Sequence, residues 1–593
     1  MIYRYLKILL FVAAAAVAFS CTPEEVPEDD SVIVDPDPEP EPEPEPDPTP
    51  TPEPDTEPSY DNLAAYDVLK SYVNRQYSPD FKLGAGVTAH EFILKGQHYD
   101  LAVSNFNEMT TGNAMKQASI MKRDGSMDFT LVKSFLDIAE QAGMTVYGHT
   151  LAWHAQQAND YLRGLLKGKK VEVPSGTGSE ILLEADFNDG YSPFNGWGNE
   201  SSREVVDGCL KISNPSSVMN WQAQFAYDMA QPFIKDQEYK LSFRIKGSSA
   251  GTLSSGFQIT DGYKSAGEFP DVQFDKEWKS VEINCTCTAE GGTRLIFSFG
   301  AFAGDIYIDD LFFMTTGVNY DYEPLTDAEK KEVLTEAMDR WIKGVMEVTA
   351  KRVCAWDAVN ESVSGSDRDG DGYYELESGA WGSSNNFYWQ DYLGSEDYIR
   401  IVVGKARKYY EEFGGTKPLM LFINDYNLES DWDDNKKLKS LIHWIEVWES
   451  DGVTKIDGIG TQMHVSCYED RNIQASKERH YVKMLELMAA TGKLVKITEL
   501  DMGYVDSNGN TVPTSQMQDY QHRAMADYYE FIVRKYFEIV PFEQQYGITQ
   551  WCMQDAPGAL GTGWRGGEPV GLWDLSYNRK YAYAGFAEGM KWL

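Results

Sequence analysis

Residues 494–501, LVKITELD, decide the fold class, because they form a short apolar run that ends in acidic side chains. A run of this length and composition predicts a buried β-strand. Further runs of the same character lie at residues 82–88, 144–151, 352–359, 419–426, 456–463 and 548–553. Amphipathic helical stretches separate them, and strands that alternate with helices predict a parallel sheet. This α/β sheet is either doubly wound or closed into a (β/α)₈ barrel.

The clearest helical stretch, residues 327–348, begins at Thr326 and Glu329, which form a capping box. Its apolar residues recur at helical spacing and predict one buried face. They are Val333, Leu334, Ala337, Met338, Trp341, Ile342 and Val345.

The alternation of strands and helices stops between residues 171 and 318. Residues 239–245, 294–299 and 305–313 alternate apolar and polar side chains, and Gly, Ser and Asn are frequent beside them. This pattern predicts an antiparallel β-sandwich. Because helices and strands resume at residue 319, we expect the sandwich to be inserted in a loop of the first domain, which spans residues 59–170 and 319–593.

The amino-terminal residues predict a secretory signal and a site of lipid attachment. Arg4 and Lys7 precede an apolar run at residues 8–19, and Cys21 follows small side chains. This order is typical of a secretory signal, and it resembles the lipobox of bacterial lipoproteins, which implies cleavage after residue 20 and a lipid on Cys21. An ordinary signal peptide with an incidental cysteine is the alternative. Residues 21–58 contain 13 Pro and 15 Asp or Glu without Lys or Arg, and they predict an extended stalk.

The composition excludes several classes of protein. The chain has 593 residues with 53 Lys and Arg against 92 Asp and Glu, a formal charge of −39. Phosphates would be repelled, so nucleic acid is excluded as the main partner. The 15 Trp, 35 Tyr and 27 Phe exclude a chain that is disordered throughout. After the amino terminus there is no apolar stretch long enough for an internal membrane span.

Polar and aromatic residues follow most of the predicted strands, where barrel enzymes place their chemistry. These clusters are GHTLAWHAQ at residues 148–156, WDAVNE at 356–361, NDYN at 424–427, GTQMH at 460–464, ITELD at 497–501 and WCMQD at 551–555. Glu361 and Glu499 end two different strands, and paired carboxylates across a cleft are what glycoside hydrolysis requires. Trp153, Trp551 and Trp564 offer flat faces for sugar rings. A single Glu at such a position would more often form a surface ion pair.

These motifs, in this order, resemble those of the glycoside hydrolase family 10 xylanases over residues 60–170 and 320–593. The resemblance implies a (β/α)₈ barrel and a retaining endo-β-1,4-xylanase that needs no cofactor for catalysis. It implies that Glu361 is the acid/base and Glu499 the nucleophile. The substrate-binding residues that it implies are Asn113, Lys116, His149, Trp153, Gln156, Asn360, Tyr426, Gln462, His464, Asp501, Trp551 and Trp564.

Within that set, Asn113, Lys116, His149, Trp153 and Gln156 would line the non-reducing side, and Tyr426 the leaving-group side. The chain departs from the family at Gly112 and Gln117, where Glu and Trp are usual, and at the extra residues between Asp555 and Trp564. These departures leave the second glycone subsite and the accepted xylan decorations open.

The predicted sandwich also has a resemblance. LEADFNDG at residues 183–190, Trp197, and IYIDD at residues 306–310 are similar to carbohydrate-binding modules of the family 4, 9 and 22 type. This implies a jelly roll, with Glu184 and Asp310 as candidate ligands of a structural calcium ion. Trp197, Trp221 and Tyr263 are candidates for stacking on sugars. A spacer or a dimerisation domain is the alternative.

A second candidate calcium site lies in DRDGDG at residues 367–372. Asp367, Asp369 and Asp371 match the first, third and fifth positions of a calcium-binding loop, but Ser378 stands where the closing Glu would be. The pattern therefore favours a solvated acidic loop over a metal site.

We therefore expect an enzyme that cleaves xylan or decorated xylan and is anchored by lipid to the outer membrane of a Gram-negative cell. We expect it to face the cell surface, with a periplasmic orientation as the alternative. Two alternatives stay open. One is a non-catalytic glycan-binding lipoprotein, and the other is an enzyme for β-1,3-xylan or mixed glucan. The oligomeric state is not determined by the sequence.

Overall fold

The computed structural model describes residues 60–593 except 74–77, 79, 175–177, 189–190, 319, 384 and 556–563. The predicted signal segment, Cys21 and the whole of the predicted stalk lie outside the described residues. Among the helices that the structure describes, none combines the length and the apolar character that crossing a membrane requires.

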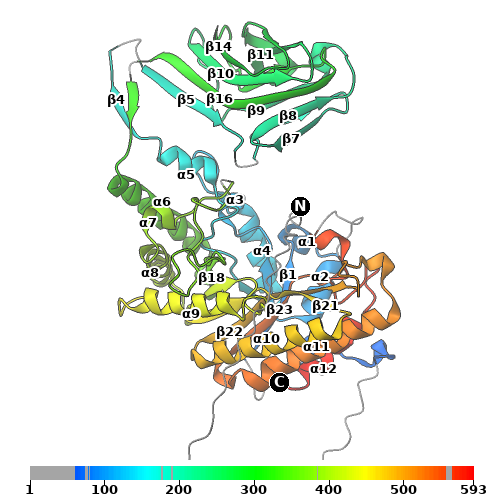
Figure 1. The fold of residues 1–593 in the computed structure, drawn as a ribbon. Helices are drawn as coiled ribbons and strands as arrows, with labels where there is room; N and C mark the ends of the chain where they lie inside the picture. Colours follow the sequence, from blue (N-terminus) through cyan, green and yellow to red (C-terminus); the bar gives the residue numbers. More distant parts are fainter. Residues whose placement is uncertain are drawn as a thin grey trace, which may run out of the picture. The chain divides into compact units, whose positions relative to one another are not determined.

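Eight parallel strands form the core of the first domain (Figure 1). In chain order they are β1 (Lys82–Val87), β2 (Glu108–Thr111), β3 (Thr145–Tyr147), β18 (Ala355–Asn360), β19 (Met420–Asp425), β20 (Gly458–Thr461), β22 (Leu494–Val505) and β23 (Gln545–Gln550). The sheet runs in the order β18-β19-β20-β22-β23-β1-β2-β3. Parallel bridges from Gly148 to Trp356 and from Ala152 to Val359 join its two ends. The predicted (β/α)₈ barrel is therefore confirmed, and the doubly wound alternative is wrong.

One strand of the barrel, β2, was not predicted from the sequence. All four of its residues are buried, although Glu108 and two threonines make it polar. Inside the barrel the Glu108 carboxylate pairs with the Lys496 ammonium of β22 at 2.7 Å. A polar strand of this kind has no apolar run by which it could be recognised. Its Glu108 can be buried because Lys496, far away in the sequence, neutralises the charge.

Helices surround the strands. The longer ones are α2 (Gln97–Asn105), α4 (Thr130–Gln141), α6 (Asp327–Thr349), α8 (Asp397–Glu412), α9 (Lys436–Glu449), α10 (Arg471–Ala490), α11 (Asp519–Ile539) and α12 (Tyr581–Met590); α1 (Ala89–Ile93), α3 (Gln117–Ile120), α5 (Asn159–Leu165) and α7 (Gln390–Leu393) are short. The capping box that begins α6 is formed as predicted, since the Glu329 carboxylate accepts from the Thr326 N–H at 2.9 Å. Most of the predicted apolar face of α6 is buried.

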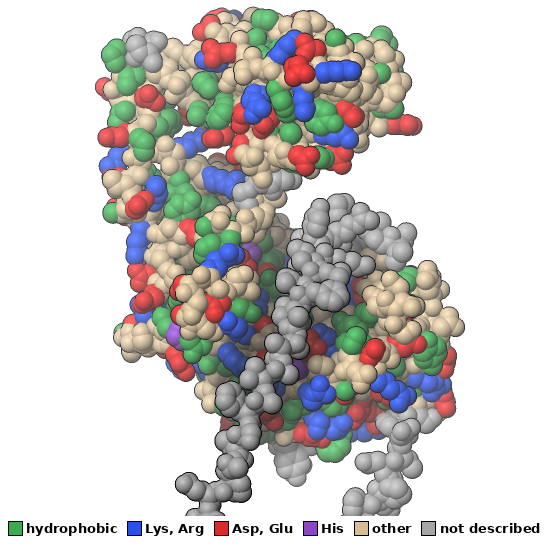
Figure 2. Space-filling model, in the orientation of Figure 1, with side chains coloured by type: hydrophobic (Ala, Val, Ile, Leu, Met, Phe, Trp, Pro, Cys, Tyr) green, Lys and Arg blue, Asp and Glu red, His purple; other side chains and the backbone are tan. Residues whose placement is uncertain are grey.

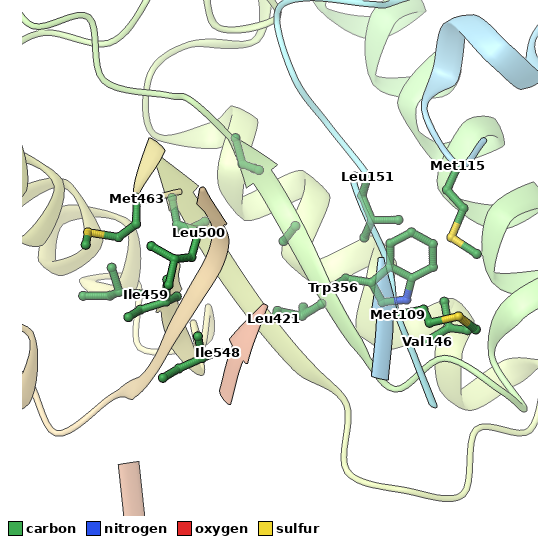
Figure 3. Packing of buried hydrophobic residues seen from close by; sticks show 14 of the residues in the cluster. Met109, Met115, Val146, Leu151, Trp356, Leu421, Ile459, Met463, Leu500 and Ile548 are labelled. Atoms are coloured by element: carbon green, nitrogen blue, oxygen red, sulfur yellow. The ribbon is translucent and has the colours of Figure 1, made fainter. Parts of the chain in front are cut away.

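Buried side chains from the strands and the loops beside them form the hydrophobic core (Figure 3). Trp356 on β18 is fully buried and belongs to the same cluster as Met109 of β2 and Val146 of β3. A methyl group added at Gly148 would collide with the Trp356 ring, so the glycine of the GHTLAWH motif makes room for the closing strand.

The insertion is an antiparallel sandwich of two sheets, and this prediction is also confirmed. One sheet has the order β14-β10-β16-β8-β7 with β5 beside β16, and the other has the order β12-β11-β15-β9-β6 with β13 beside β11. The strands are β5 (Gly178–Ala185), β6 (Asn195–Trp197), β7 (Ser202–Val206), β8 (Cys209–Asn214), β9 (Gln224–Asp228), β10 (Glu238–Gly247), β11 (Gly251–Ile259), β12 (Lys264–Glu268), β13 (Val272–Phe274), β14 (Lys279–Thr286), β15 (Arg294–Ser298) and β16 (Gly304–Val318).

The sandwich has its own aromatic core, in which Phe225 and Phe297 stack with centroids 4.4 Å apart. In the sequence it lies between β3 and β18, and a ribbon of β4 (Lys169–Glu172) and β17 (Tyr320–Glu323) flanks it. On the face shown in Figure 2, Lys and Arg side chains are interspersed among Asp and Glu. The acidic side chains coloured on that face are therefore not gathered into one patch.

Candidate active site

Of the two predicted catalytic carboxylates, Glu361 directly follows β18. Glu499 does not end its strand as expected but lies within β22, two residues after Ile497 forms the last pair with β20. Asn360 is the last residue of β18, and Glu361 follows it with φ +52°, in the left-handed region. A residue other than glycine is uncommon there and must be held by its surroundings. The Glu361 N–H donates to the Asn424 carbonyl on the neighbouring strand β19 at 2.7 Å, which fixes this turn.

Three side chains, those of the adjacent Asn360 and of Gln462 and Trp153 from other parts of the barrel, hold the Glu361 carboxylate. Its Oε1 accepts from Gln462 Nε2 at 2.9 Å and from Asn360 Nδ2 at 3.2 Å, and its Oε2 accepts from Trp153 Nε1 at 3.1 Å. Burial raises the pKa of Glu361, and the negative charges of Asp425 and Glu499 raise it further. Glu361 therefore keeps its proton to a higher pH than an exposed glutamate does.

Glu499 has the opposite electrostatic surroundings. Its Oε2 lies 3.3 Å from His464 Nε2, and its Oε1 accepts from Asn424 Nδ2 at 3.1 Å. Burial alone would raise the pKa of Glu499, but the hydrogen bond from His464, with the nearby His149 and Lys116, lowers it. Two neighbouring carboxyl groups with opposite shifts are the arrangement that separates an acid from a nucleophile.

His464 connects Glu499 to Asp501. The Nδ1 of His464 lies 3.0 Å from Asp501 Oδ2, and Asp501 is fully buried. Burial alone would lower the pKa of His464, but Asp501 and Glu499 raise it to about 10. The imidazole is therefore a cation near neutral pH, and it donates to a carboxylate from each nitrogen.

Asn424 connects the two carboxylates through one hydrogen-bond network, although it was not among the predicted site residues. Its Nδ2 donates to Asn360 Oδ1 at 2.9 Å as well as to Glu499, and its Oδ1 accepts from Thr498 Oγ1 at 2.7 Å. The signal that could have found it is its place at the start of the NDYN motif, directly at a strand end.

A second cluster lies beside Glu361 and Glu499. Lys116 Nζ donates to Gln156 Oε1 and to Asn113 Oδ1 at 3.3 Å, and it lies 4.8 Å from the centroid of the Trp153 ring. Burial lowers the pKa of Lys116, whereas Glu499 and Glu361 oppose that shift. The Lys116 ammonium is therefore close enough to Glu361 and Glu499 to interact electrostatically with both.

His149 belongs to the same cluster. Its Nδ1 lies 2.8 Å from Asp357 Oδ2 on β18, and its ring centroid lies 6.0 Å from Trp551. Asp357 also accepts from the Tyr147 hydroxyl at 2.6 Å. Asp357 was quoted in the WDAVNE motif but not recognised as the partner of His149, because the two residues are far apart in the sequence.

Aromatic rings surround His464. Its ring centroid lies 6.3 Å from Trp551 and 5.1 Å from Trp564, whose Nε1 donates to Asp501 at 2.7 Å. Tyr426 lies beside Lys437, whose ammonium is 3.3 Å from its ring centroid, and burial, followed by the charges of Asp425 and Glu361, raises the pKa of Tyr426. The structure therefore gathers every barrel residue predicted for the site.

The two positions that depart from the family differ in surroundings. A methyl group added at Gly112 would find only the Trp551 ring, at 3.9 Å, so space remains beside that glycine. Gln117 is buried, and its Oε1 accepts from the Ala158 N–H at 3.1 Å. Position 117 therefore supports the loop that carries Gln156 and Gln157.

The acidic loop contains one set of carboxylates close enough to share a cation, the only such set among the described residues. It consists of Asp367, Asp369 and Glu375, so Glu375 takes the place predicted for Asp371. Asp367 pairs with Lys436 at 2.7 Å, and the Glu375 carboxylate accepts from the Asp369 N–H at 3.0 Å. These internal bonds hold the loop, and the interpretation that it is a solvated acidic loop rather than a calcium site stays a prediction.

The candidate calcium ligands of the module do not form a comparable set. Asp310 pairs with Arg244 at 3.2 Å, and Glu184 lies on β5 opposite Phe312 of β16. Calcium at this position also stays a prediction.

The three aromatic residues predicted for glycan binding line one hollow of about 990 Å³ on the module. Trp197, Trp221 and Tyr263 are 38%, 62% and 74% exposed. The other lining residues are Asn199, Val218, Gln222, Gln224, Gln258 and Arg294. Flat exposed rings beside amide groups suit sugar rings and their hydroxyls.

Comparisons with known proteins agree with this geometry. The family described as Glycosyl hydrolase family 10 matches residues 72–173 and 321–589, and the one described as Carbohydrate binding domain matches residues 179–301. Endo-1,4-beta-xylanase A of Caldicellulosiruptor saccharolyticus is 30% identical over 223 residues, 37% of this chain and 56% of the relative. Endo-1,4-beta-xylanase B of Thermotoga neapolitana is 29% identical over 262 residues, 44% of this chain and 63% of the relative.

Solved structures share the fold. An endo-1,4-beta-xylanase from Caldicellulosiruptor owensensis has a TM-score of 0.50 and 18% identity, covering 88% of this chain and 99% of that one. A structure described as GH10 from Paenibacillus barcinonensis has the same TM-score and identity, covering 88% and 97%. The alignments span less than two thirds of the curated relatives, whereas the family match covers both parts of the barrel. The chain therefore belongs to glycosyl hydrolase family 10.

Proposed function

We propose that this protein is a retaining endo-β-1,4-xylanase in which Glu361 is the acid/base and Glu499 the nucleophile. One observation carries the proposal: the two carboxyl groups lie on different strands, are joined by one hydrogen-bond network, and have pKa values shifted in opposite directions. Such a pair supplies a proton donor and an ionised nucleophile at the same pH.

The reaction has two steps. In the first, a Glu499 oxygen attacks the anomeric carbon, the glycosidic bond breaks, and the Glu361 proton passes to the leaving oxygen. The bond to Glu499 neutralises its charge, so the pKa of Glu361 is expected to fall once the intermediate has formed. Glu361 can then take a proton from water as the water oxygen attacks the same carbon and releases Glu499.

The surrounding residues support a sugar polymer as substrate. Trp153 and Trp551 offer ring faces, while Asn113, Lys116 and Gln156 offer polar groups on the proposed non-reducing side. Tyr426 lies on the proposed leaving-group side. The names of the aligned relatives favour xylan with β-1,4 linkages over β-1,3-xylan or mixed glucan.

Product analysis tests this proposal. The wild-type protein should release xylo-oligosaccharides from plain xylan, and NMR of the first products should show the β-anomer. Comparison of arabinoxylan with glucuronoxylan would show which decorations are accepted. Cleavage of β-1,3-xylan or mixed glucan alone would exclude the proposed linkage, and no cleavage of any glycan would favour the non-catalytic alternative.

We further propose that the inserted module binds xylan through its aromatic hollow. In a Glu499→Ala background, Trp221→Ala and Tyr263→Ala should each weaken retardation on soluble xylan in affinity electrophoresis, because each substitution removes an exposed flat apolar face against which a sugar ring can pack. Trp592→Ala is the matched control, since Trp592 is 57% exposed and lies on the barrel. Equal retardation of all three variants would make the module a spacer or a dimerisation domain.

We also propose that Cys21 carries a lipid that holds the enzyme at the outer membrane, facing the cell surface. The basic start, the apolar run and the small residues before Cys21 support it. Cys21→Ser should move the protein from the membrane fraction to the soluble fraction, because the variant loses the proposed site of lipid attachment. Protease treatment of whole cells distinguishes surface from periplasmic exposure. Continued fractionation of Cys21→Ser with membranes would contradict the anchor.

A further inference from the structure

Arg565 follows Trp564 and makes four polar contacts near the site. Its Nη1 donates to Asp501 Oδ1 at 2.8 Å and to the Val465 carbonyl at 2.7 Å. Its Nη2 donates to Ser466 Oγ at 2.8 Å and lies 3.1 Å from Glu568 Oε2. A planar guanidinium suits such a set of acceptors better than an ammonium does.

These contacts extend the row of charges that ends at the proposed nucleophile. Glu568, Arg565, Asp501, His464 and Glu499 alternate in sign, and each touches the next. Asp501 stands at the centre and is fully buried. One of its oxygens faces Arg565, and the other faces His464 and Trp564, so its carboxylate cannot rotate without losing hydrogen bonds on both sides.

The backbone is adapted to the Arg565 side chain. Arg565 has φ +48°, which places it in the left-handed region. Gly503 on β22 lies opposite Ser466 of β21 (His464–Tyr468), and a methyl group added there would collide with the Glu568 carboxylate and the Arg565 guanidinium. The missing side chain at Gly503 therefore leaves the space that the pair of Arg565 and Glu568 occupies.

We infer that Arg565 is a positioning residue for the nucleophile, acting through Asp501 and His464. It holds Asp501 in the orientation that keeps His464 donating to Glu499, and its charge favours the ionised form of both carboxylates. The inference rests on the proposed role of Glu499. Other titratable groups that face this row are Lys116, His149, Asp357, Glu361, Glu429, Tyr529 and Cys552.

Three variants test the inference on an aryl β-xylobioside and on xylan. Arg565→Ala removes the guanidinium, Arg565→Lys keeps the charge without the forked geometry, and Gly503→Ala displaces an intact Arg565. Each should lower kcat by about 10- to 100-fold with little change in KM, because a misplaced nucleophile impairs the chemical step more than binding. In Arg565→Ala the acidic limb of kcat/KM should move to higher pH, since Glu499 becomes harder to ionise. Added guanidinium should restore part of kcat in Arg565→Ala but not in Gly503→Ala.

A matched control separates positioning from simple stability. Arg407, on α8, also binds a carboxylate, that of Asp457, at 2.6 Å and the Lys455 carbonyl at 2.7 Å. Asp457 directly precedes β20, at the opposite end of that strand from the site. Arg407→Ala should lower Tm without changing the pH profile or kcat. If Arg565→Ala behaves in the same way, Arg565 is only structural and the inference is overturned.

A spectroscopic readout does not depend on turnover. The Nδ1 proton of His464 should exchange with solvent faster in Arg565→Ala than in the wild type or in Arg407→Ala, because Asp501 is then free to turn away. Equal exchange rates would overturn the inference even if the enzyme is active. A wild-type protein inactive on every glycan, with the Nδ1 proton still protected by Arg565, would instead refute the proposed function.

Discussion

Glu499→Ala is expected to be almost inactive on xylan and on aryl xylosides alike, whereas Glu361→Ala should be selective in its loss. Without Glu499 no covalent intermediate can form, and removal of a nucleophile costs on the order of 10⁴- to 10⁶-fold in kcat. Without Glu361 the leaving oxygen goes unprotonated, which costs about 10²- to 10⁴-fold on xylan. Aryl xylosides with good leaving groups need little protonation and should keep much of their first-step rate.

Azide separates the two roles further. In Glu361→Ala the small anion can enter the space of the missing carboxylate and attack the intermediate, giving a β-glycosyl azide, which NMR identifies. Glu411→Ala is the control, because Glu411 is exposed on α8. An α-glycosyl azide, or equal losses on both classes of substrate, would contradict the assignment of Glu361.

Lys496→Met is expected to have the largest effect on stability. The ion pair of Lys496 with Glu108 is 0% and 1% exposed, and Glu108 also accepts from the Tyr546 hydroxyl at 3.0 Å. Loss of the ammonium leaves a buried carboxylate without its counter-charge, which costs about 3–5 kcal/mol of unfolding free energy. The Lys496 ammonium also lies 4.2 Å from the Tyr147 ring centroid, and this contact would be lost as well.

Urea denaturation at neutral pH measures the effect. The double variant Lys496→Met with Glu108→Gln should recover much of the lost stability, since an uncharged amide costs far less to bury than a lone carboxylate. Lys591→Met is the control, because its partner Glu588 lies 2.6 Å away but the lysine side chain is 51% exposed, and such pairs contribute about 0–1 kcal/mol. A midpoint for Lys496→Met equal to that of Lys591→Met would show that the buried pair is dispensable.

Local patterns were sufficient for most of the fold. The run at residues 494–500 and its counterparts predicted seven of the barrel strands, because each buries apolar side chains that are contiguous in the sequence. The capping box at Thr326 and Glu329 predicted where α6 begins, since its hydrogen bonds join residues three apart. β2 could not be predicted in this way, because its buried Glu108 pairs with Lys496, a residue far away in the sequence. No local pattern around Glu108 indicates that ion pair.

The candidate site divides in the same way. The sequence alone determined which residues stand at strand ends, and the closed parallel barrel brings those ends together, so Glu361, Glu499 and the motif residues around them could be predicted. Only the tertiary structure decided which side chains hold them. Asn424 donates to Glu499 and to Asn360, Asp357 orients His149, and Arg565 holds Asp501. Each of these contacts joins residues more than 60 positions apart, and such hydrogen bonds and charge pairings arise only when the strands close into the barrel.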